Sequence, residues 1–153
     1  MTKQIQPTTW RCGRFLFDFS IRTTPLVMGI LNATPDSFSD GGKYRTAAEA
    51  IAQAEKMINC GVDLIDIGGE STRPGAEPVN LQEELDRVLP VIEALKDCGV
   101  PLSIDTYKAE TMRQALNAGA DCVNDIWALR QDGALAAVLE NDSCGIVLMH
   151  MQR

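Results

Sequence analysis

Short apolar runs alternate with amphipathic segments along most of the chain. The runs are too short for helices and are mostly rich in Val, Ile and Leu, which favours buried strands. The five expected strands are Leu26–Leu31, Leu64–Ile67, Pro101–Ile104, Asp121–Asn124 and Gly145–Met149. Apolar residues recur at helical spacing in Ala47–Asn59, Leu81–Asp97, Ala109–Asn117 and Leu129–Glu140. This alternation predicts a parallel sheet joined by right-handed crossovers.

A weak internal repeat supports this arrangement. In each copy a glycine precedes an apolar run, and a polar residue follows five or six positions after the glycine. Gly61, Gly99 and Gly119 suit the left-handed residue just past a helix, whereas Gly145 follows a loop. The polar residues at the expected strand ends are Asn32, Asp66, Asp105, Asn124, Asp125 and His150. Parallel βα folds gather such ends on one face, where ligands bind.

Two further segments modify the pattern. Pro90 lies inside the second helical segment, where it removes a backbone donor, so we expect a kink or a division into two helices. Residues Trp10–Phe19 are expected to form a hairpin around Cys12-Gly13-Arg14 that covers the other end of a barrel.

The pattern allows two closures of the sheet. One is an open, doubly wound sheet of five strands, and the other is the first five strands of an eight-stranded barrel. The length of 153 residues favours the open sheet, because a barrel typically needs about 250 residues.

Composition is that of one ordinary globular domain, with 45% apolar and 23% charged residues. A net charge of −7 argues against nucleic-acid or anionic-membrane partners, which require dense Lys and Arg. No apolar leader or membrane-spanning stretch is present, so we expect a cytoplasmic protein. Five widely spaced cysteines without a C-x-x-C pair predict reduced thiols.

Two loops carry candidate chemistry. Turn-forming residues 32–42 predict a loop over the binding face, with oxygen ligands of the kind that Mg²⁺ prefers. An ordinary Asx turn, with Asp40 capping the next helix, explains the same residues. After the second strand, Gly68 and Gly69 permit close backbone approach, and Arg73 offers a planar fork for carboxylate or phosphate.

Strand-end side chains supply further candidates, each with a structural alternative. Asp105 can accept the paired N–H groups of an aminopyrimidine ring, or it can cap the following helix. Asn124 can donate to and accept from a heterocycle edge, although such residues are common where loops begin. His150 is the only histidine, so no His-based metal cluster or Ser-His relay can form, and we expect it to be structural.

Read in order, five segments resemble the dihydropteroate synthase family. The most specific are MGILNATPDSFSDGG at 28–42 and DIGGESTRPG at 66–75, followed by SIDT at 103–106, NDI at 124–126 and LMHM at 148–151. The resemblance extends from about residue 14 to the end of the chain. It implies an α/β fold, the first five strands of an eight-stranded TIM-type barrel with an N-terminal hairpin, and a single partial pterin-binding domain over residues 1–153.

The resemblance also implies a transferase reaction of folate biosynthesis. In that reaction, 6-hydroxymethyl-7,8-dihydropterin pyrophosphate and 4-aminobenzoate give dihydropteroate and pyrophosphate, with Mg²⁺ as cofactor. The implied catalytic residues are Asn32, Asp36 and Arg73, with Asn32 also binding the metal. The implied pterin site comprises Asp105, Asn124, Ile126 and Met149, and the implied aminobenzoate site comprises Phe38, Thr72, Arg73 and Pro74.

The sequence departs from the family after Arg153, where later strand-end Asp, Lys, Arg and His positions have no counterpart. We therefore expect a weakly active or inactive fragment with exposed sheet edges and poor solubility. A homodimer is implied for the full-length form. Two alternatives are a methyl-folate-binding methyltransferase domain and a non-catalytic pterin-binding fragment. The segments TPDSFSDGG and STRPG favour the synthase.

Overall fold

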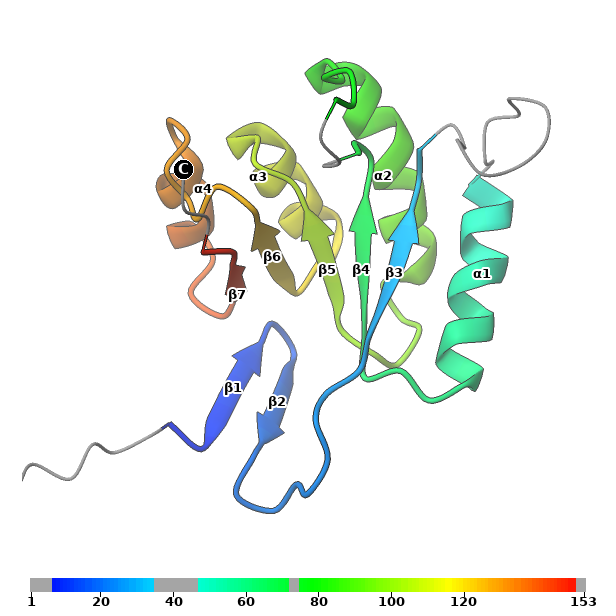
Figure 1. Ribbon diagram of the computed structural model, residues 1–153, viewed down its shortest axis with the longest axis vertical. Helices are drawn as coiled ribbons and strands as arrows, with labels where there is room; N and C mark the ends of the chain where they lie inside the picture. Colours follow the sequence, from blue (N-terminus) through cyan, green and yellow to red (C-terminus); the bar gives the residue numbers. More distant parts are fainter. Residues whose placement is uncertain (1–6, 35–46, 72–74, 151–153) are drawn as a thin grey trace, which may run out of the picture.

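The computed structural model describes residues 7–34, 47–71 and 75–150. They form an antiparallel hairpin and a five-stranded parallel sheet with the order β3-β4-β5-β6-β7 (Figure 1). The strands are β1 Thr9–Cys12, β2 Phe15–Asp18, β3 Met28–Asn32, β4 Leu64–Gly68, β5 Leu102–Asp105, β6 Cys122–Asp125 and β7 Gly145–Leu148. The helices are α1 Ala47–Asn59, α2 Leu81–Leu95, α3 Ala109–Ala118 and α4 Ala134–Leu139.

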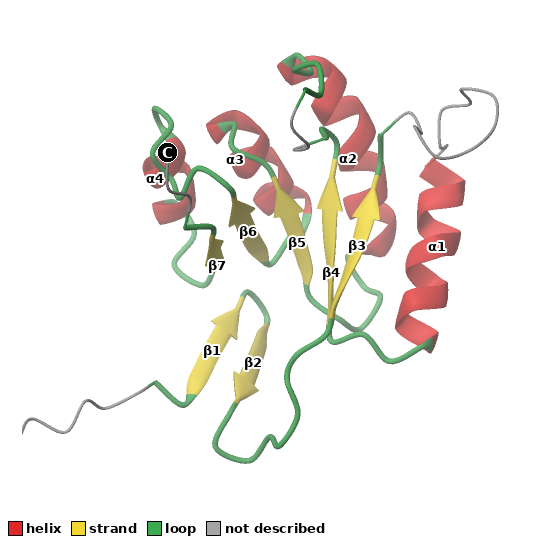
Figure 2. Ribbon diagram, in the orientation of Figure 1, coloured by secondary structure: helices red, strands yellow, loops and turns green. Residues whose placement is uncertain are grey.

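The sheet order decides between the two predicted closures. Each strand pairs with the next in sequence, and all four pairs are parallel. A doubly wound sheet reverses its strand order at a switch point so that helices cover both faces. Here the described helices lie on one face of the sheet, and the other face is not covered by a described helix (Figure 2). The described part of the chain is therefore wound as a barrel, and the open doubly wound sheet predicted from length is wrong.

The core lies between the sheet and the helices. Residues on one side of each strand, such as Ile67 on β4, Ile104 on β5 and Val123 on β6, are fully buried. They belong to one cluster with Val88 and Ile92 of α2. Burying each such side chain contributes about 1.5–3 kcal/mol, so this face fixes the strand register. The alternate residues consequently point to the helix-free face.

Two helices differ from the prediction. Helix α2 is one helix that contains Pro90, so the suggested division into two helices is wrong. Helix α4 begins at Ala134 instead of Leu129. The reason is local, because Ala128, Leu129 and Gly133 have φ of 54°, 57° and 76°, which a right-handed helix excludes.

The predicted hairpin is confirmed, and it covers the amino-terminal end of the sheet. Its turn residue Gly13 has φ 58°, and its backbone N–H donates to the carbonyl of Ser143, just before β7, at 2.8 Å. A Cβ on Gly13 would lie 2.4 Å from Oδ1 of Asp121, so glycine is required for this close approach. Cys12 is similarly close to Gly145. Figure 1 shows the hairpin below β6 and β7.

The edge strands carry exposed apolar side chains. Ile30 on β3 is 55% exposed, and Leu148 on β7 is 50% exposed. These are the two unpaired edges of the described sheet, and they fit the expected edge exposure. Of the described helices, none combines the length and the apolar character needed to cross a bilayer.

Candidate functional site

Register brings four residues into one row across the helix-free face. Asn32 pairs with Gly68, Gly68 with Asp105, and Asp105 with Asn124. Because paired residues of a parallel sheet point to the same side, Asn32, Asp105 and Asn124 project together near the carboxyl ends of β3, β5 and β6. The prediction that polar strand ends gather on one face is confirmed for these three residues.

A second row lies one layer nearer the amino ends of the strands. It contains Asp66 and Ser103, which are paired across β4 and β5, and Cys122, which pairs with Ser103. Asn124 Nδ2 donates to Asp66 Oδ2 at 2.9 Å, so the side chains of β4 and β6 meet across β5. Asp66 lies within β4 rather than at its end, and it is almost completely buried.

Three buried polar atoms of these rows lack a hydrogen-bond partner within the described residues. They are Asp66 Oδ1, Ser103 Oγ and Asp105 Oδ1. Leaving such an atom unsatisfied typically costs about 1–3 kcal/mol. All three can accept hydrogen bonds. The arrangement is therefore suited to a ligand edge that presents several N–H donors.

The electrostatics of the rows favour proton exchange near neutrality. Burial raises the pKa of Asp105 to about 7, with further contributions from the carboxylates of Asp66, Glu84, Asp125 and Glu70. Burial also raises the pKa of Asp66, whereas the neighbouring Ser103 and Asn124 side chains act to lower it. Like charges and low dielectric both disfavour ionisation. A carboxyl group with such a pKa can change charge when a donor-rich ligand binds.

Asp125 organises the turn after β6. Its Oδ1 accepts from the N–H of Trp127 and its Oδ2 from the N–H of Leu129, each at 2.8 Å. Its carbonyl accepts from the N–H of Met149 at 3.2 Å, which ties this turn to the end of β7. The turn thereby places Ile126 and Met149 at the same end of the sheet as Asn124. Whether both side chains wall a pterin pocket stays a prediction.

A partly buried ionic cluster lies at the end of β4. The carboxylate of Glu70 accepts from the hydroxyl of Tyr107 at 2.8 Å and pairs with Lys108. Lys108 also lies 3.1 Å from Glu84 Oε2, which accepts from Thr111 Oγ1 at 3.0 Å. These residues join the β4 exit to α2 and α3. Sequence reasoning missed them, although a glutamate on the apolar side of α2 was an available signal.

Several predicted site residues lie outside the described part of the chain. They are Asp36, Phe38, Thr72, Arg73 and Pro74. Asn32 is exposed, and within residues 7–34, 47–71 and 75–150 no three His, Cys, Asp or Glu side chains cluster as metal ligands would. His150 is exposed beyond β7, and its structural role stays a prediction.

Known proteins match this chain closely. Residues 28–153 match the family model described as Pterin binding enzyme. The dihydropteroate synthase of Bacillus subtilis (strain 168) is 54% identical over 132 residues, which cover 86% of this chain and 46% of that relative. The Synechocystis enzyme of the same name is 52% identical over 141 residues, covering 92% of this chain and 48% of the relative.

Solved structures agree with these matches. Burkholderia cenocepacia dihydropteroate synthase complexed with 7,8-dihydropteroate has a TM-score of 0.83 at 54% identity, covering 96% of this chain and 48% of the other. Xanthomonas albilineans dihydropteroate synthase with 4-aminobenzoic acid has a TM-score of 0.85 at 50% identity, covering 95% and 52%. The chain thus spans about half the length of these relatives. The resemblance predicted from the sequence is confirmed, and the chain belongs to the pterin binding enzyme family.

Proposed function

We propose that the chain functions as a dihydropteroate synthase, which joins 6-hydroxymethyl-7,8-dihydropterin pyrophosphate to 4-aminobenzoate and releases pyrophosphate. The observation that carries the proposal is the acceptor-rich pair of rows at the strand ends, with buried and unpartnered atoms on Asp66, Ser103 and Asp105. A pterin presents ring N–H and amino donors along one edge, and these match such acceptors. Relatives solved with dihydropteroate and with 4-aminobenzoic acid support both halves of the reaction.

Asp105 and Asn124 would hold the pterin ring. They are neighbours in register, so their side chains can engage adjacent positions of one planar edge. Donors from the pterin would favour the ionised form of Asp105, whose pKa of about 7 places it close to that change. Ile126 and Met149, brought together by Asp125, would contact the faces of the ring.

The leaving pyrophosphate requires stabilisation of its developing charge. Asn32, exposed at the end of β3, offers a carboxamide oxygen suited to Mg²⁺. One such donor fits an ion held largely by pyrophosphate oxygens and water, which is the usual manner for Mg²⁺. When bound, the ion would neutralise charge on the leaving group. Asp36 would assist Asn32 in this region.

The amine would reach the pterin methylene from the side of the β4 exit. Phe38, Thr72, Arg73 and Pro74 are proposed to bind 4-aminobenzoate. The segment holding the last three follows Glu70, whose carboxylate is fixed by Tyr107 and Lys108. In the reaction, the C–O bond to pyrophosphate breaks, a C–N bond forms, and the amine loses its proton.

A second candidate is pterin binding without turnover. This candidate is supported by the acceptor atoms of the two rows alone, and it does not depend on the names of the relatives. The names of those relatives favour the synthase over a methyl-folate methyltransferase. We also propose that the full-length form is a homodimer. We propose a cytoplasmic location because all five cysteines are free. The net charge of −7 gives no support for a nucleic-acid partner.

The deciding experiment uses the purified 153-residue chain. Pterin pyrophosphate with Mg²⁺ is titrated first, and 4-aminobenzoate is then added while dihydropteroate is measured. Binding with product formation supports the synthase, and binding without product supports the second candidate. A folded chain that binds no pterin overturns both. Asp63→Asn, at the opposite end of β4, serves as a control that should bind normally.

A further inference from the structure

The side-chain amide of Asn124 has a defined orientation. Its Nδ2 donates to Asp66 Oδ2 at 2.9 Å, in a part-buried position. An ionised carboxylate can only accept hydrogen bonds, whereas a carboxamide has one donating and one accepting end. A carboxylate at this position therefore selects the amide end of Asn124. The carbonyl end is left for another partner.

The other polar neighbours do not make this selection. Ser103 and Asp105 lie on β5, between the strands that carry Asp66 and Asn124. Ser103 Oγ and Asp105 Oδ1 have no hydrogen-bond partner among the described residues. The Ser103 hydroxyl could bond with either end of the amide, because a hydroxyl both donates and accepts hydrogen bonds. Asp66 is thus the group that fixes the orientation of Asn124.

The position of Asp66 gives this contact its significance. It lies inside β4 and is almost completely buried, where an ionised carboxyl group is costly unless it is bonded. Its Oδ2 accepts from Asn124, and its Oδ1 has no hydrogen-bond partner among the described residues. In the same layer, the paired position of β3 carries the apolar Ile30 and that of β5 carries Ser103.

We infer that Asp66 is a positioning residue that orients the Asn124 carboxamide, so that Asn124 and Asp105 together present acceptors to the ligand and select a heterocycle edge rich in N–H donors. The inference rests on the proposed function and deepens it, since it assigns the selection of the ligand edge to a residue that need not touch the ligand. A heterocycle edge with oxygen in place of the amino group would place an acceptor opposite the acceptors of Asn124 and Asp105, so its binding is disfavoured.

Ligand discrimination tests the inference. Dissociation constants for 6-hydroxymethylpterin and 6-hydroxymethyllumazine, which carries oxygen in place of the amino group, are measured by calorimetry for the wild type and Asp66→Asn. The substituted amide can face Asn124 with either end. The preference for the pterin over the lumazine should therefore fall about tenfold, which corresponds to the free energy of roughly one hydrogen bond. Asp63→Asn removes a carboxylate that precedes β4 and pairs with Arg22, and this variant should keep the wild-type preference.

A second measurement separates the inference from the proposed function and needs no variant. In the ligand-free wild type, one Nδ2 proton of Asn124 should exchange slowly with solvent and the other quickly, as read by NMR of the side-chain amides. Equal, fast exchange of both protons overturns the inference, as does an unchanged pterin preference in folded Asp66→Asn. Protected exchange in a chain that binds neither heterocycle overturns the proposed function and the ligand selection, while the orientation of Asn124 by Asp66 stands.

Discussion

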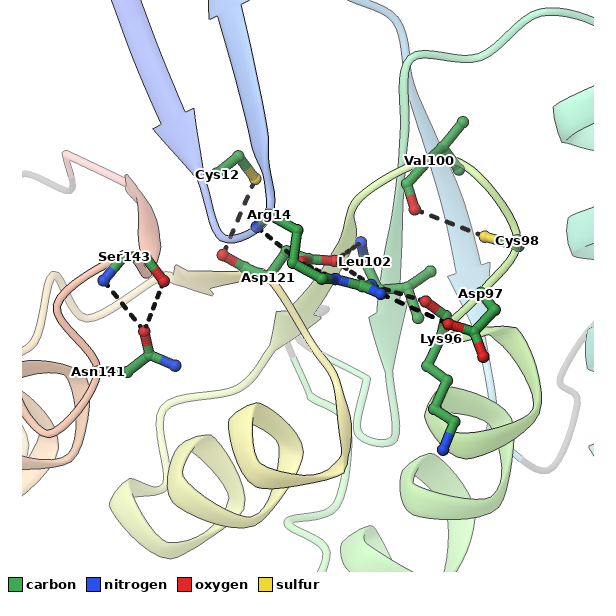
Figure 3. Close-up of polar contacts among 10 residues, drawn as sticks. All are labelled: Cys12, Arg14, Lys96, Asp97, Cys98, Val100, Leu102, Asp121, Asn141 and Ser143. Carbon is green, nitrogen blue, oxygen red and sulfur yellow. Dashed lines mark hydrogen bonds and ion pairs between the residues drawn. The ribbon is translucent and has the colours of Figure 1, made fainter.

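Arg14 forms a bidentate ion pair with Asp121 through two side-chain nitrogens. Nε lies 3.0 Å from Oδ1 and Nη2 lies 3.1 Å from Oδ2, which is the two-pronged geometry that guanidinium and carboxylate favour (Figure 3). Arg14 Nη2 also donates to the carbonyl of Lys96, and Asp121 accepts from the N–H of Leu102. One pair thus joins the hairpin to the end of α2 and to the start of β5 and β6.

The two partners of this pair should differ in their effect on stability. Asp121 is 2% exposed and satisfies the buried N–H of Leu102, so Asp121→Ala should lower the free energy of unfolding by about 3–5 kcal/mol. The side chain of Arg14 is half exposed, and Arg14→Ala should cost clearly less. Urea unfolding measures both. Equal losses would contradict the role given to Leu102, and Arg130→Ala on the exposed surface should be nearly neutral.

The raised pKa of Asp105 predicts a pH-dependent stability. The folded carboxyl keeps its proton up to about pH 7, whereas the unfolded one loses it near 3.8. The contribution of this group is therefore full below about pH 3.8, declines as the pH rises towards 7 and is flat above that. Unfolding from pH 4 to 8 should show this decline in the wild type and not in Asp105→Asn. Parallel profiles for the two proteins would rule out the shift.

The cluster around Lys108 predicts a strong dependence between its members. Lys108→Met leaves Glu84 buried without its cation and should destabilise the fold by about 3–5 kcal/mol. The double variant Lys108→Met with Glu84→Gln should recover part of that loss, because the uncompensated charge is gone. Thermal unfolding of the single and double variants gives the coupling. Additive losses would mean that the two residues act independently.

The turn after β6 holds strain that glycine can relieve. Ala128 has φ 54°, a conformation that costs a non-glycine residue about 1–2 kcal/mol. Ala128→Gly should therefore raise the free energy of unfolding by up to about 1 kcal/mol after the flexibility of glycine is counted. Ala136→Gly, within α4 and exposed, should lower it by about 1 kcal/mol. Calorimetric melting compares them, and a loss in both would argue against strain at Ala128.

Sequence predicted the elements well because their signals are local. Helix α1 begins and ends where periodicity placed it, and the five strands follow apolar runs. The glycines Gly61, Gly99 and Gly119 do have the expected positive φ. Local sequence signals do not predict pairings between residues that are distant in the chain. The bond between Asp66 and Asn124 spans 58 residues and depends on the register of three strands.

Two other features also lacked a local signal. The late start of α4 follows from positive φ at Ala128, Leu129 and Gly133, and the two non-glycine residues among them carry no sequence signal for that conformation. The burial of Glu84 depends on a lysine that follows β5, on a separate element. Length favoured the open sheet wrongly, since the sheet order is set by the crossovers and not by how many strands are present.

NMR can test, at the side chains themselves, whether the strand-end rows bind a pterin edge. The chain, labelled at Asp carboxyl carbons and Asn side-chain amides, is titrated with 6-hydroxymethylpterin. We predict that the resonances of Asp66, Asp105 and Asn124 shift in saturable fashion, while those of Asp63 and Asp121 at the opposite end of the sheet stay in place. Saturable shifts at Asp63 and Asp121 with none at Asp105 and Asn124 would contradict the account.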